Sequence, residues 1–384
     1  MKYELANKLD EEVESTRSLK VARKAIRAFL DILEMGDEVT TPLFKLAAEK
    51  CLKNLRFLGE IHEAENVHKA LIKRFPHDPQ HRNQLTVAYL IQNKWNQAKR
   101  TLEETLIQWP NDGLALVHYG FILKIESKDL INAVEYLQAG IQTGDEGTAD
   151  GRFYFHLGDA LVRLERSSEA EEVHKAGARK GLFLSSYQRA VHYISRLTGR
   201  PWWTAEQTTY EDFYRSLEVN WRVIKEEALN ALFKSEQSFQ NERENLLHKG
   251  EWKEFEIFSR GNKIQRNCDR VPRTCDLISS FAPTSECQRG QVKFSVMTPG
   301  THIWPHCGPS NCRLRSHLGL YGLDGAYIRV ANETRQWQEG KVLIFDDSFE
   351  HEVWHNGSLP RLVLIVDMWH PEVRAHERKT LPEI

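Results

Sequence analysis

The sequence predicts a two-part α+β chain in which a helical solenoid precedes an all-β sandwich or small barrel. Three observations predict it: a length of 384 residues, a helical repeat in the first half, and a period-two pattern from about residue 251. A single core usually stops growing near roughly 250–300 residues, so this length favours two domains. The expected ranges are 1–195 for the helical domain, 196–250 for a linker with bridging helices, and 251–384 for the β domain.

The helical half carries an internal repeat with a period of roughly 34 residues. Near-identical octamers, EAENVHKA and EAEEVHKA, occur at 63–70 and 169–176. A small residue in each second helix, followed by a proline, resembles the tetratricopeptide pattern, a row of helix pairs that bury their apolar faces on one another. The alternative is an irregular helical bundle, and both predict helix over about 15–195. The repeated positions are Ala64, Ala98, Ala133 and Ala170, Pro76 and Pro110, and Asp78 and Asp112.

The pattern changes after RLTGRPWWTAEQ, where Gly199 and Pro201 break the helical run. A bridging helix is expected in SLEVNWRVIKEEALNALF. Beyond it, short runs of β-branched and aromatic residues between turn signals predict strands. These runs are VKFSVM, CRLRSHLGL, AYIRVANE, KVLIFDD and RLVLIVDMW.

Composition excludes several classes of protein. A hydrophobic content of 41% and a charged content of 28% are ordinary for a soluble globular protein. A net charge of −2 gives no electrostatic drive toward nucleic acid, so no such partner is expected. No run reaches the roughly 18–20 apolar residues of a membrane span, and any anchor is expected in a segment preceding residue 1. Sequons at Asn332 and Asn356 would accept glycans only in the secretory pathway.

The run CRLRSHL concentrates potential chemistry on one face of a strand. Alternation projects Arg313, Arg315 and His317 to one side and Leu314, Ser316 and Leu318 to the other. Guanidiniums and an imidazole are costly in a core unless anions meet them. The alternative is a solvated outer face. The same parity groups Lys293, Ser295 and Met297 in VKFSVM.

Two zinc interpretations compete for the histidines. His351 and His355 form an HExxH string, but a zinc peptidase needs it on a helix, and the flanking sequence is strand-like. Extended chain would hold these histidines about 13 Å apart. A site built from His306, Cys307, Cys312 and His317 is also conceivable, although Gly308-Pro309 and a strand would scatter those side chains.

A third interpretation pairs His306 with the distal His351. Arg361 follows His351 at the start of an apolar strand. Two histidines and a later arginine are the layout of iron(II), 2-oxoglutarate oxygenases, in which imidazoles bind the metal and the guanidinium fork holds a carboxylate. Most such enzymes have an acidic residue two positions after the first histidine, where this chain has Gly308.

With this glycine included, the sequence resembles the aspartyl/asparaginyl β-hydroxylase family. The motifs that carry the resemblance are WPHCGPSNCRLRSHLGL, ANETRQWQEGKVLIFDDSFEHEVWHN, RLVLIVDMWHP, the PWW linker and the ending KTLPEI. The resemblance implies a double-stranded β-helix (jelly-roll, cupin-like) oxygenase domain. It also implies iron held by two histidines without a protein carboxylate, with water in the vacant position, and Gly308 agrees with that.

The resemblance also implies roles for individual residues. His306 and His351 would bind the metal, and Arg361 with Ser295 would bind the distal carboxylate of 2-oxoglutarate. Arg315 and His317 would lie at the C1 carboxylate and the substrate and take part in catalysis. The full expected cofactor-binding set is Trp252, Ser295, Arg315, Ser316, His317 and Arg361.

The implied activity is hydroxylation of the β-carbon of Asp or Asn in epidermal-growth-factor-like domains, using Fe(II), 2-oxoglutarate and O₂. The implied place is the endoplasmic reticulum lumen, behind a membrane anchor in a longer protein. Spacing alone leaves open whether Cys268 and Cys275 are bridged, and the resemblance implies that they are. The alternatives are an oxygenase of the same architecture with another substrate, and a non-catalytic tetratricopeptide binding scaffold.

Overall fold

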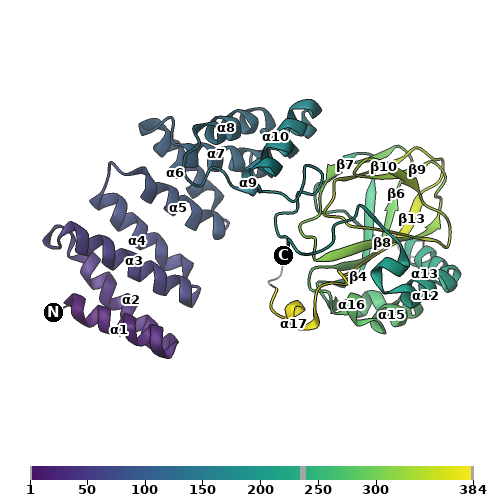
Figure 1. The fold of residues 1–384 in the computed structure, drawn as a ribbon, viewed down its shortest axis with the longest axis horizontal. Helices are drawn as coiled ribbons and strands as arrows, with labels where there is room; N and C mark the ends of the chain where they lie inside the picture. The colour runs from purple at the N-terminus through teal and green to yellow at the C-terminus, as the bar shows by residue number, and fades with distance from the viewer. Residues whose placement is uncertain (1, 234–238, 382–384) are drawn as a thin grey trace. The chain divides into compact units, whose positions relative to one another are not determined.

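The computed structural model describes residues 2–233 and 239–381 and divides into two compact units, Met1–Leu164 and Glu165–Ile384 (Figure 1). The predicted fold class is confirmed: a helical repeat region is followed by a domain of antiparallel sheets. Of the ending KTLPEI, the last three residues lie outside the described residues.

The first unit consists of helices that pack on their neighbours in sequence. Ala98 and Ala133, from the predicted repeat, are fully buried on second helices of successive pairs. Asp78 and Asp112 each accept a backbone N–H two or three residues ahead, so the repeated aspartates cap the first helix of a pair. The helices are α1 (Lys2–Thr16), α2 (Leu19–Glu34), α3 (Thr41–Leu58), α4 (Ile61–Arg74), α5 (Pro79–Ile91), α6 (Trp95–Gln108), α7 (Gly113–Ile125), α8 (Leu130–Thr143) and α9 (Gly151–Arg163).

The second unit begins with the last repeat helix, α10 (Ser167–Arg179). The expectation of helix through residue 195 is wrong, because no helix lies between Arg179 and Ala205. The backbone of this segment is instead bonded to loops of the β domain: Gln188 and Phe349 form an antiparallel bridge, and the Ile194 N–H donates to the Asn311 side chain. Those loops are remote in sequence, so helical periodicity could not reveal them.

The bridging helix is confirmed as two helices separated at Asn220. They are α12 (Glu211–Val219) and α13 (Trp221–Phe233). Short helices complete the unit: α11 (Ala205–Thr208), α14 (Gln265–Cys268), α15 (Pro272–Ser279), α16 (Ala282–Ser285) and α17 (Ala375–Arg378).

Two antiparallel sheets form the β domain. The larger has the order β1-β11-β8-β13-β6-β4-β2, with β5 on β4, and the smaller has the order β10-β9-β12-β7-β3. The predicted runs are confirmed as β6, β8, β9, β11 and β13, and the strands expected to carry His306 and His351 are confirmed as β7 and β12, whereas the long β4 was not predicted. The strands are β1 (Trp202–Trp203), β2 (Gln240–Asn241), β3 (Leu247–Lys249), β4 (Trp252–Ser259), β5 (Asn262–Lys263), β6 (Gln291–Met297), β7 (Thr301–His306), β8 (Arg313–Tyr321), β9 (Ala326–Val330), β10 (Glu333–Gln336), β11 (Val342–Phe345), β12 (His351–His355) and β13 (Arg361–Trp369).

The larger sheet separates two kinds of interior. Its outer face contributes alternate residues of β6, β8 and β13 to a hydrophobic core with helices α12, α13 and α15, which lie beside it in Figure 1. Its inner face meets the smaller sheet across a second core that includes Ile303, Val353 and Val363. Lys293 and Ser295 of β6 and Arg313, Arg315 and His317 of β8 lie on the inner face, where a site can form between the sheets.

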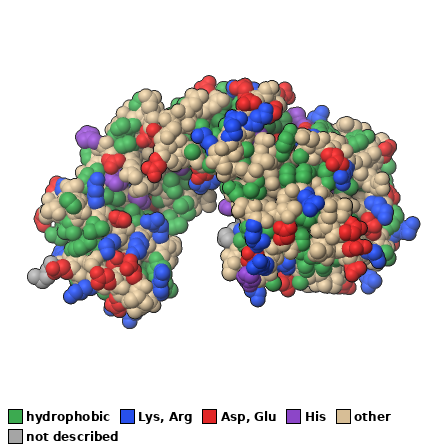
Figure 2. Space-filling view, in the orientation of Figure 1, with side chains coloured by type: hydrophobic (Ala, Val, Ile, Leu, Met, Phe, Trp, Pro, Cys, Tyr) green, Lys and Arg blue, Asp and Glu red, His purple; other side chains and the backbone are tan. Residues whose placement is uncertain are grey.

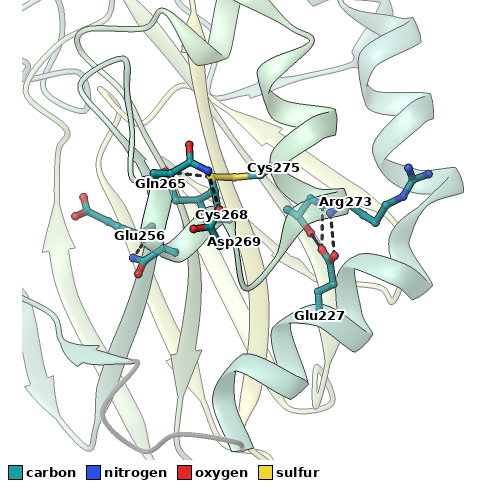
Figure 3. The surroundings of a disulfide bond; sticks show 10 residues. Glu227, Glu256, Gln265, Cys268, Asp269, Arg273 and Cys275 are labelled. Atoms are coloured by element: carbon teal, nitrogen blue, oxygen red, sulfur yellow. Dashed lines mark hydrogen bonds between the residues drawn. A yellow bond between two sulfur atoms is a disulfide. The ribbon is translucent and has the colours of Figure 1, made fainter.

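The disulfide between Cys268 and Cys275 is confirmed, with the two Cα atoms 5.4 Å apart (Figure 3). It joins α14 to α15. Glu227, from α13, caps α15 by accepting the backbone N–H groups of Arg273 and Thr274, both at 2.9 Å. The clipped loop is thereby fixed to the helices behind the larger sheet.

Among the described residues, no helix has the length and apolar character to cross a membrane. On the face seen in Figure 2, acidic and basic side chains are interspersed over both units.

Candidate active site between the two sheets

His306 and His351 face each other across neighbouring strands. They are register partners on β7 and β12, and their ring centroids are 4.1 Å apart. The register shifts between His351 and Val353, where β7 contains one residue more than β12, so a bulge lies at Trp304-Pro305. Without that bulge, His306 would share the outer face with His302. Proline suits the position because it has no ladder N–H to lose.

Backbone contacts fix the tautomer of both rings. Nδ1 of His306 lies 2.7 Å from the Trp304 carbonyl, and Nδ1 of His351 lies 2.9 Å from the Phe349 carbonyl. A carbonyl only accepts, so each Nδ1 carries the proton and each Nε2 keeps its lone pair. Burial lowers the pKa of both histidines, and their mutual proximity lowers that of His351 further. Two neutral imidazoles oriented by backbone carbonyls fit a divalent metal ion.

Arg361 is a buried guanidinium that meets no anion in the part of the chain that the structure describes. Its side chain is 2% exposed, and Nη2 donates to the Ser295 hydroxyl at 2.9 Å. Among residues 2–233 and 239–381 its Nε has no hydrogen-bond partner and no carboxylate pairs with it. Burial lowers the pKa of Arg361 to about 9. An unpaired charge in a protein interior is costly, so the arrangement points to an acidic ligand.

The predicted partners of Arg361 are in place. Ser295 accepts from Arg361 and also from Nε1 of Trp252, each at 2.9 Å. Its own hydroxyl proton is therefore left to donate. Met297 and Lys293 lie on the same face of β6, as alternation predicted.

His317 lies near both Arg361 and His351. Besides burial, the charge of Arg361 lowers the pKa of His317, and His317 is among the groups that lower the pKa of His351. The ring stacks on Trp337 with centroids 5.8 Å apart. Both ring nitrogens are buried without a hydrogen-bond partner in the described part of the chain. Burial, with the two neighbouring guanidiniums, holds the pKa of His317 well below its ordinary value, so a neutral ring is available to a ligand.

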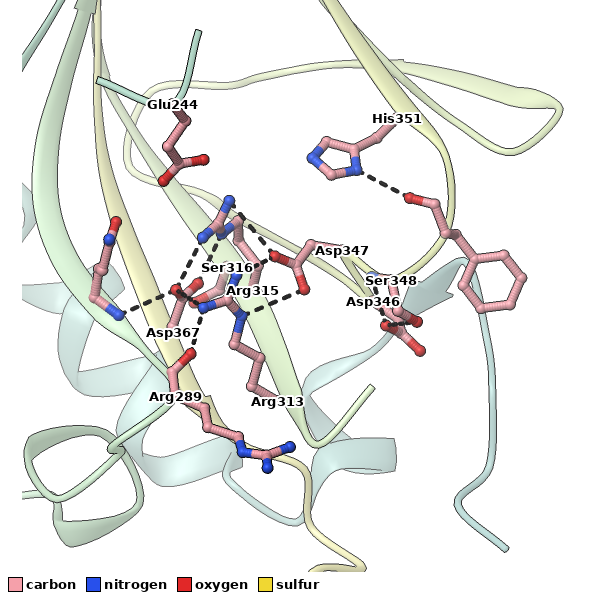
Figure 4. Close-up of polar contacts among 12 residues, drawn as sticks. Glu244, Arg289, Arg313, Arg315, Ser316, Asp346, Asp347, Ser348, His351 and Asp367 are labelled. Carbon is pink, nitrogen blue, oxygen red and sulfur yellow. Dashed lines mark hydrogen bonds and ion pairs between the residues drawn. The ribbon is translucent and has the colours of Figure 1, made fainter. Parts of the chain in front are cut away.

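Arg313 and Arg315 point inward as well, but both are paired (Figure 4). Arg315 binds Asp367 through two parallel bonds of 2.7 and 2.9 Å, and Arg313 binds Asp347 at 2.7 Å. Burial alone would raise the pKa of Asp367, but the two guanidiniums hold it well below its ordinary range. The interpretation of this side of β8 as a solvated outer face is therefore wrong. Asp347 and Asp367 are the anions that compensate its buried guanidiniums.

Gly308 owes its identity to Asp347. A Cβ at position 308 would lie 2.5 Å from the Asp347 carboxylate, closer than side chains approach. The Gly308 N–H also donates to the Asp347 backbone carbonyl at 2.6 Å. The space that a side chain at position 308 would need is therefore taken by Asp347, in the loop that precedes β12.

Neither zinc interpretation survives. β12 is extended through both histidines of HExxH, so the helix needed by a peptidase is absent there. Among the described residues, no group of three or more His, Cys, Asp or Glu could hold a metal ion. Cys312 instead packs in a small apolar cluster with Cys287 and Trp369.

Ser316 is the one predicted site residue that the structure keeps away from the others. Its side chain lies on the outer face of β8 with Leu314 and Leu318, and its hydroxyl donates to the Val366 carbonyl at 3.0 Å. Arg315 is in the interior, but its guanidinium is already engaged by Asp367. Its contact with a C1 carboxylate stays a prediction.

Sequence reasoning missed Asp347, Asp367 and Glu244. Burial alone would raise the pKa of Glu244, but the nearby charges of Lys293, Arg315 and Arg313 lower it. One signal was available: Asp367 interrupts the apolar run RLVLIVDMW, on the same face as Arg361. A lone carboxylate in such a run calls for a buried cation.

Comparisons with known proteins agree with this geometry. The sequence model described as Aspartyl/Asparaginyl beta-hydroxylase matches residues 218–371. Aspartyl/asparaginyl beta-hydroxylase of Mus musculus is 45% identical over 384 residues, which is all of this chain and 51% of the relative. A solved structure of MamA from Desulfovibrio magneticus RS-1 is 17% identical, covers 46% of this chain and 94% of its own, and has a TM-score of 0.35.

For a shorter relative, the match covers more than two thirds of that protein's own length. Aspartate beta-hydroxylase domain-containing protein 2 of Rattus norvegicus is 36% identical over 240 residues, which cover 60% of this chain and 69% of the relative. The chain spans about half the length of the mouse protein. With the histidine pair, the glycine at position 308 and these matches, the chain belongs to the aspartyl/asparaginyl β-hydroxylase family.

Proposed function

We propose that this chain is an Fe(II)- and 2-oxoglutarate-dependent dioxygenase that hydroxylates the β-carbon of Asp or Asn residues in epidermal-growth-factor-like domains. One observation carries the proposal: among the described residues, a single interior holds two neutral histidines with free Nε2 atoms and a buried guanidinium without an anion. Family membership supports the reaction, since the relatives are named for Asp and Asn β-hydroxylation.

His306 and His351 would hold the iron, and two protein ligands leave several positions for co-substrate, oxygen and water. When bound, iron(II) with 2-oxoglutarate supplies the oxidising chemistry. Arg361 would bind the distal carboxylate through its fork, with the free hydroxyl proton of Ser295 as a further donor. Trp252 keeps that hydroxyl oriented by donating to its oxygen.

His317 and the paired arginines would bind at the reacting end. The His317 ring, buried beside Trp337 and Phe345, would donate a hydrogen bond to a carboxylate of the co-substrate or substrate. The Arg313–Asp347 and Arg315–Asp367 pairs give this wall fixed charges of both signs without mobile side chains. Such preorganised groups orient ligands and exclude water.

The rival interpretations make different predictions. A non-catalytic scaffold has no need of an uncompensated buried arginine, because replacing it would cost the fold nothing. To test substrate and reaction together, an epidermal-growth-factor-like peptide is incubated with the protein, Fe(II), 2-oxoglutarate and ascorbate. Mass spectrometry should show the gain of one oxygen atom on Asp or Asn. Succinate formation without peptide oxidation would instead indicate an oxygenase with another substrate.

We also propose that the protein works in the endoplasmic reticulum lumen, with any membrane anchor in a segment outside this sequence. The Cys268–Cys275 disulfide suits an oxidising compartment. Asn332 and Asn356 of the two sequons are exposed, as glycan acceptors must be. Alkylation of protein from native cells, followed by mass spectrometry, should find this cysteine pair oxidised; free thiols there would contradict the location.

A further inference from the structure

Both histidines of the proposed metal pair lie at the ends of strands. His306 is the last residue of β7, and His351 is the first residue of β12. The ladder therefore holds each histidine from one side only. On the other side the chain continues into two loops, 307–312 and 346–350, so the separation of the two rings depends on how these loops are held.

One segment contacts both loops. We call residues 185–198, between α10 and β1, the strap. Within it, the Tyr187 carbonyl accepts the backbone N–H of Glu350 at 2.6 Å and the thiol of Cys307 at 3.7 Å. A single carbonyl thus joins the residue after His306 to the residue before His351.

The strap also binds the loop before His351 through side chains. Gln188 is 6% exposed, and its amide nitrogen lies 2.9 Å from the Ser348 hydroxyl and 3.3 Å from the Asp346 carboxylate. Arg189 donates to the Glu350 carboxylate at 2.8 Å. The bridge from Gln188 reaches Phe349, whose carbonyl accepts the Nδ1 proton of His351. The strap therefore acts on the group that orients the His351 ring.

The loop after His306 is bound by the next residues of the strap. The His192 N–H donates to the Pro309 carbonyl at 3.1 Å. Ile194 and Asn311 exchange two hydrogen bonds of 2.9 and 3.0 Å. Both loops are consequently fixed to one continuous stretch of chain, with the metal pair between them.

We propose that Gln188 and Arg189 are positioning residues for the metal pair. By tying loop 346–350 to the strap that also holds loop 307–312, they set the distance and angle between the His306 and His351 rings. The inference rests on the proposed function, since it concerns the same metal pair. Outer-shell partners of metal ligands commonly contribute about 10–100-fold to metal affinity.

The test uses Co(II), bound without turnover to the whole chain, as the probe. Gln188→Met keeps the side-chain length and removes both donors, and Arg189→Gln removes the ion pair with Glu350. Arg196→Gln is the matched control, because Arg196 lies on the same strap but pairs with Glu377, away from both loops. His351→Ala reports whether Co(II) occupies the proposed pair.

We expect the Co(II) dissociation constant to rise about tenfold in Gln188→Met and Arg189→Gln and to stay unchanged in Arg196→Gln. The visible absorption of saturating Co(II) should also change in the first two variants, which a mere loss of stability would not produce. Wild-type affinity and spectrum in both variants would overturn the inference alone. If Gln188→Met does not fold, Arg189→Gln decides. Equal Co(II) binding by wild type and His351→Ala would overturn the proposed metal pair, and the inference with it.

Discussion

Two groups of buried arginines share the space between the sheets, and only one is satisfied by the chain. Arg313 and Arg315 bind Asp347 and Asp367 in a closed network. Arg361 has a serine hydroxyl and an aromatic ring beside it, but no carboxylate within the described residues. The paired guanidiniums stabilise the fold, and the unpaired one is available to bind an anionic ligand. The two nitrogens of His306 and of His351 differ in the same way. In each ring Nδ1 donates to a backbone carbonyl, whereas Nε2 is left for a ligand.

The largest effect is expected at the unsatisfied Nε2 atoms. With only two protein ligands, His306→Ala or His351→Ala should abolish turnover and Co(II) binding. His302→Ala is the control, because His302 lies on β7 but donates to Glu352 on the outer face. Turnover assays and metal titrations check this, and retained iron-dependent turnover in either variant would remove that histidine from the site.

Replacing an arginine of each group should change the free energy of unfolding in opposite directions. Arg315→Met leaves Asp367 short of a cation and should lower the free energy of unfolding by about 3 kcal/mol. Arg361→Met removes an unpaired buried charge and should raise it by about 1 kcal/mol. Urea denaturation without metal or 2-oxoglutarate measures both. Equal destabilisation by the two changes would mean that Arg361 also stabilises the fold and is not kept for a ligand.

Co-substrate affinity should respond to the shape of the Arg361 side chain. Arg361→Lys keeps the charge and loses the fork, and one charged hydrogen bond contributes about 1.5–3 kcal/mol. We therefore expect 2-oxoglutarate binding to weaken by about one to two orders of magnitude. Arg335→Lys, at an exposed ion pair with Glu333, is the control. An unchanged dissociation constant in Arg361→Lys would sink the assignment of this arginine.

Gly308 tests whether the missing carboxylate can be restored. A Cβ there meets the Asp347 carboxylate at 2.5 Å, and an added aspartate brings a like charge beside it. We expect Gly308→Asp to lower kcat by about ten- to a hundred-fold, because small displacements of catalytic groups are costly. Gly308→Ala carries the clash without the charge and separates the two causes. A fully active Gly308→Asp enzyme would show that the glycine has no functional importance.

Asp346 gives a prediction about pH rather than about ligands, since it is bonded to Ser348 and Gln188 but forms no ion pair within the described residues. Burial raises its pKa to about 8. The folded state then keeps a proton that the unfolded state releases near pH 4. Stability should therefore fall as the pH rises from about 4 to about 8, by at most ~1.4 kcal/mol per pH unit.

Asp346→Asn removes this titration while keeping an oxygen for the Ser348 donors, and the Gln188 amide can turn to accept. Unfolding free energies at pH 6 and pH 7 should differ less in the variant than in the wild type. Parallel pH profiles for the two proteins would show that Asp346 ionises normally in the fold.

Local patterns predicted the parts of the site that lie on regular strands. Alternation along β6 and β8 placed Ser295, Arg315 and His317 on the inner face, because the period of a strand is fixed by its backbone. Spacing found His306 with His351, and Arg361 beyond them. Helix period and repeat length found the solenoid and its caps.

What the sequence did not reveal depends on contacts between distant residues. Arg313 and Arg315 meet Asp347 and Asp367 across separations of 34 and 52 residues. The strap left no helical or strand period, because its backbone bonds are made to loops more than 100 residues away. Ser316 was placed in the pocket by resemblance, although alternation along β8 gave the outer face.

The bulge at Trp304-Pro305 makes the length of β7 as informative as its histidine. His306 follows the inward Ile303 by three residues, an odd step that would turn the imidazole to the outer face in a regular strand, and the bulge offsets that step. A chain with one residue fewer between these two positions would need no bulge, because a two-residue step already places the histidine on the inner face opposite His351. Any homologue should therefore be judged both by the number of residues from the buried aliphatic position to the histidine and by whether the strand contains the bulge.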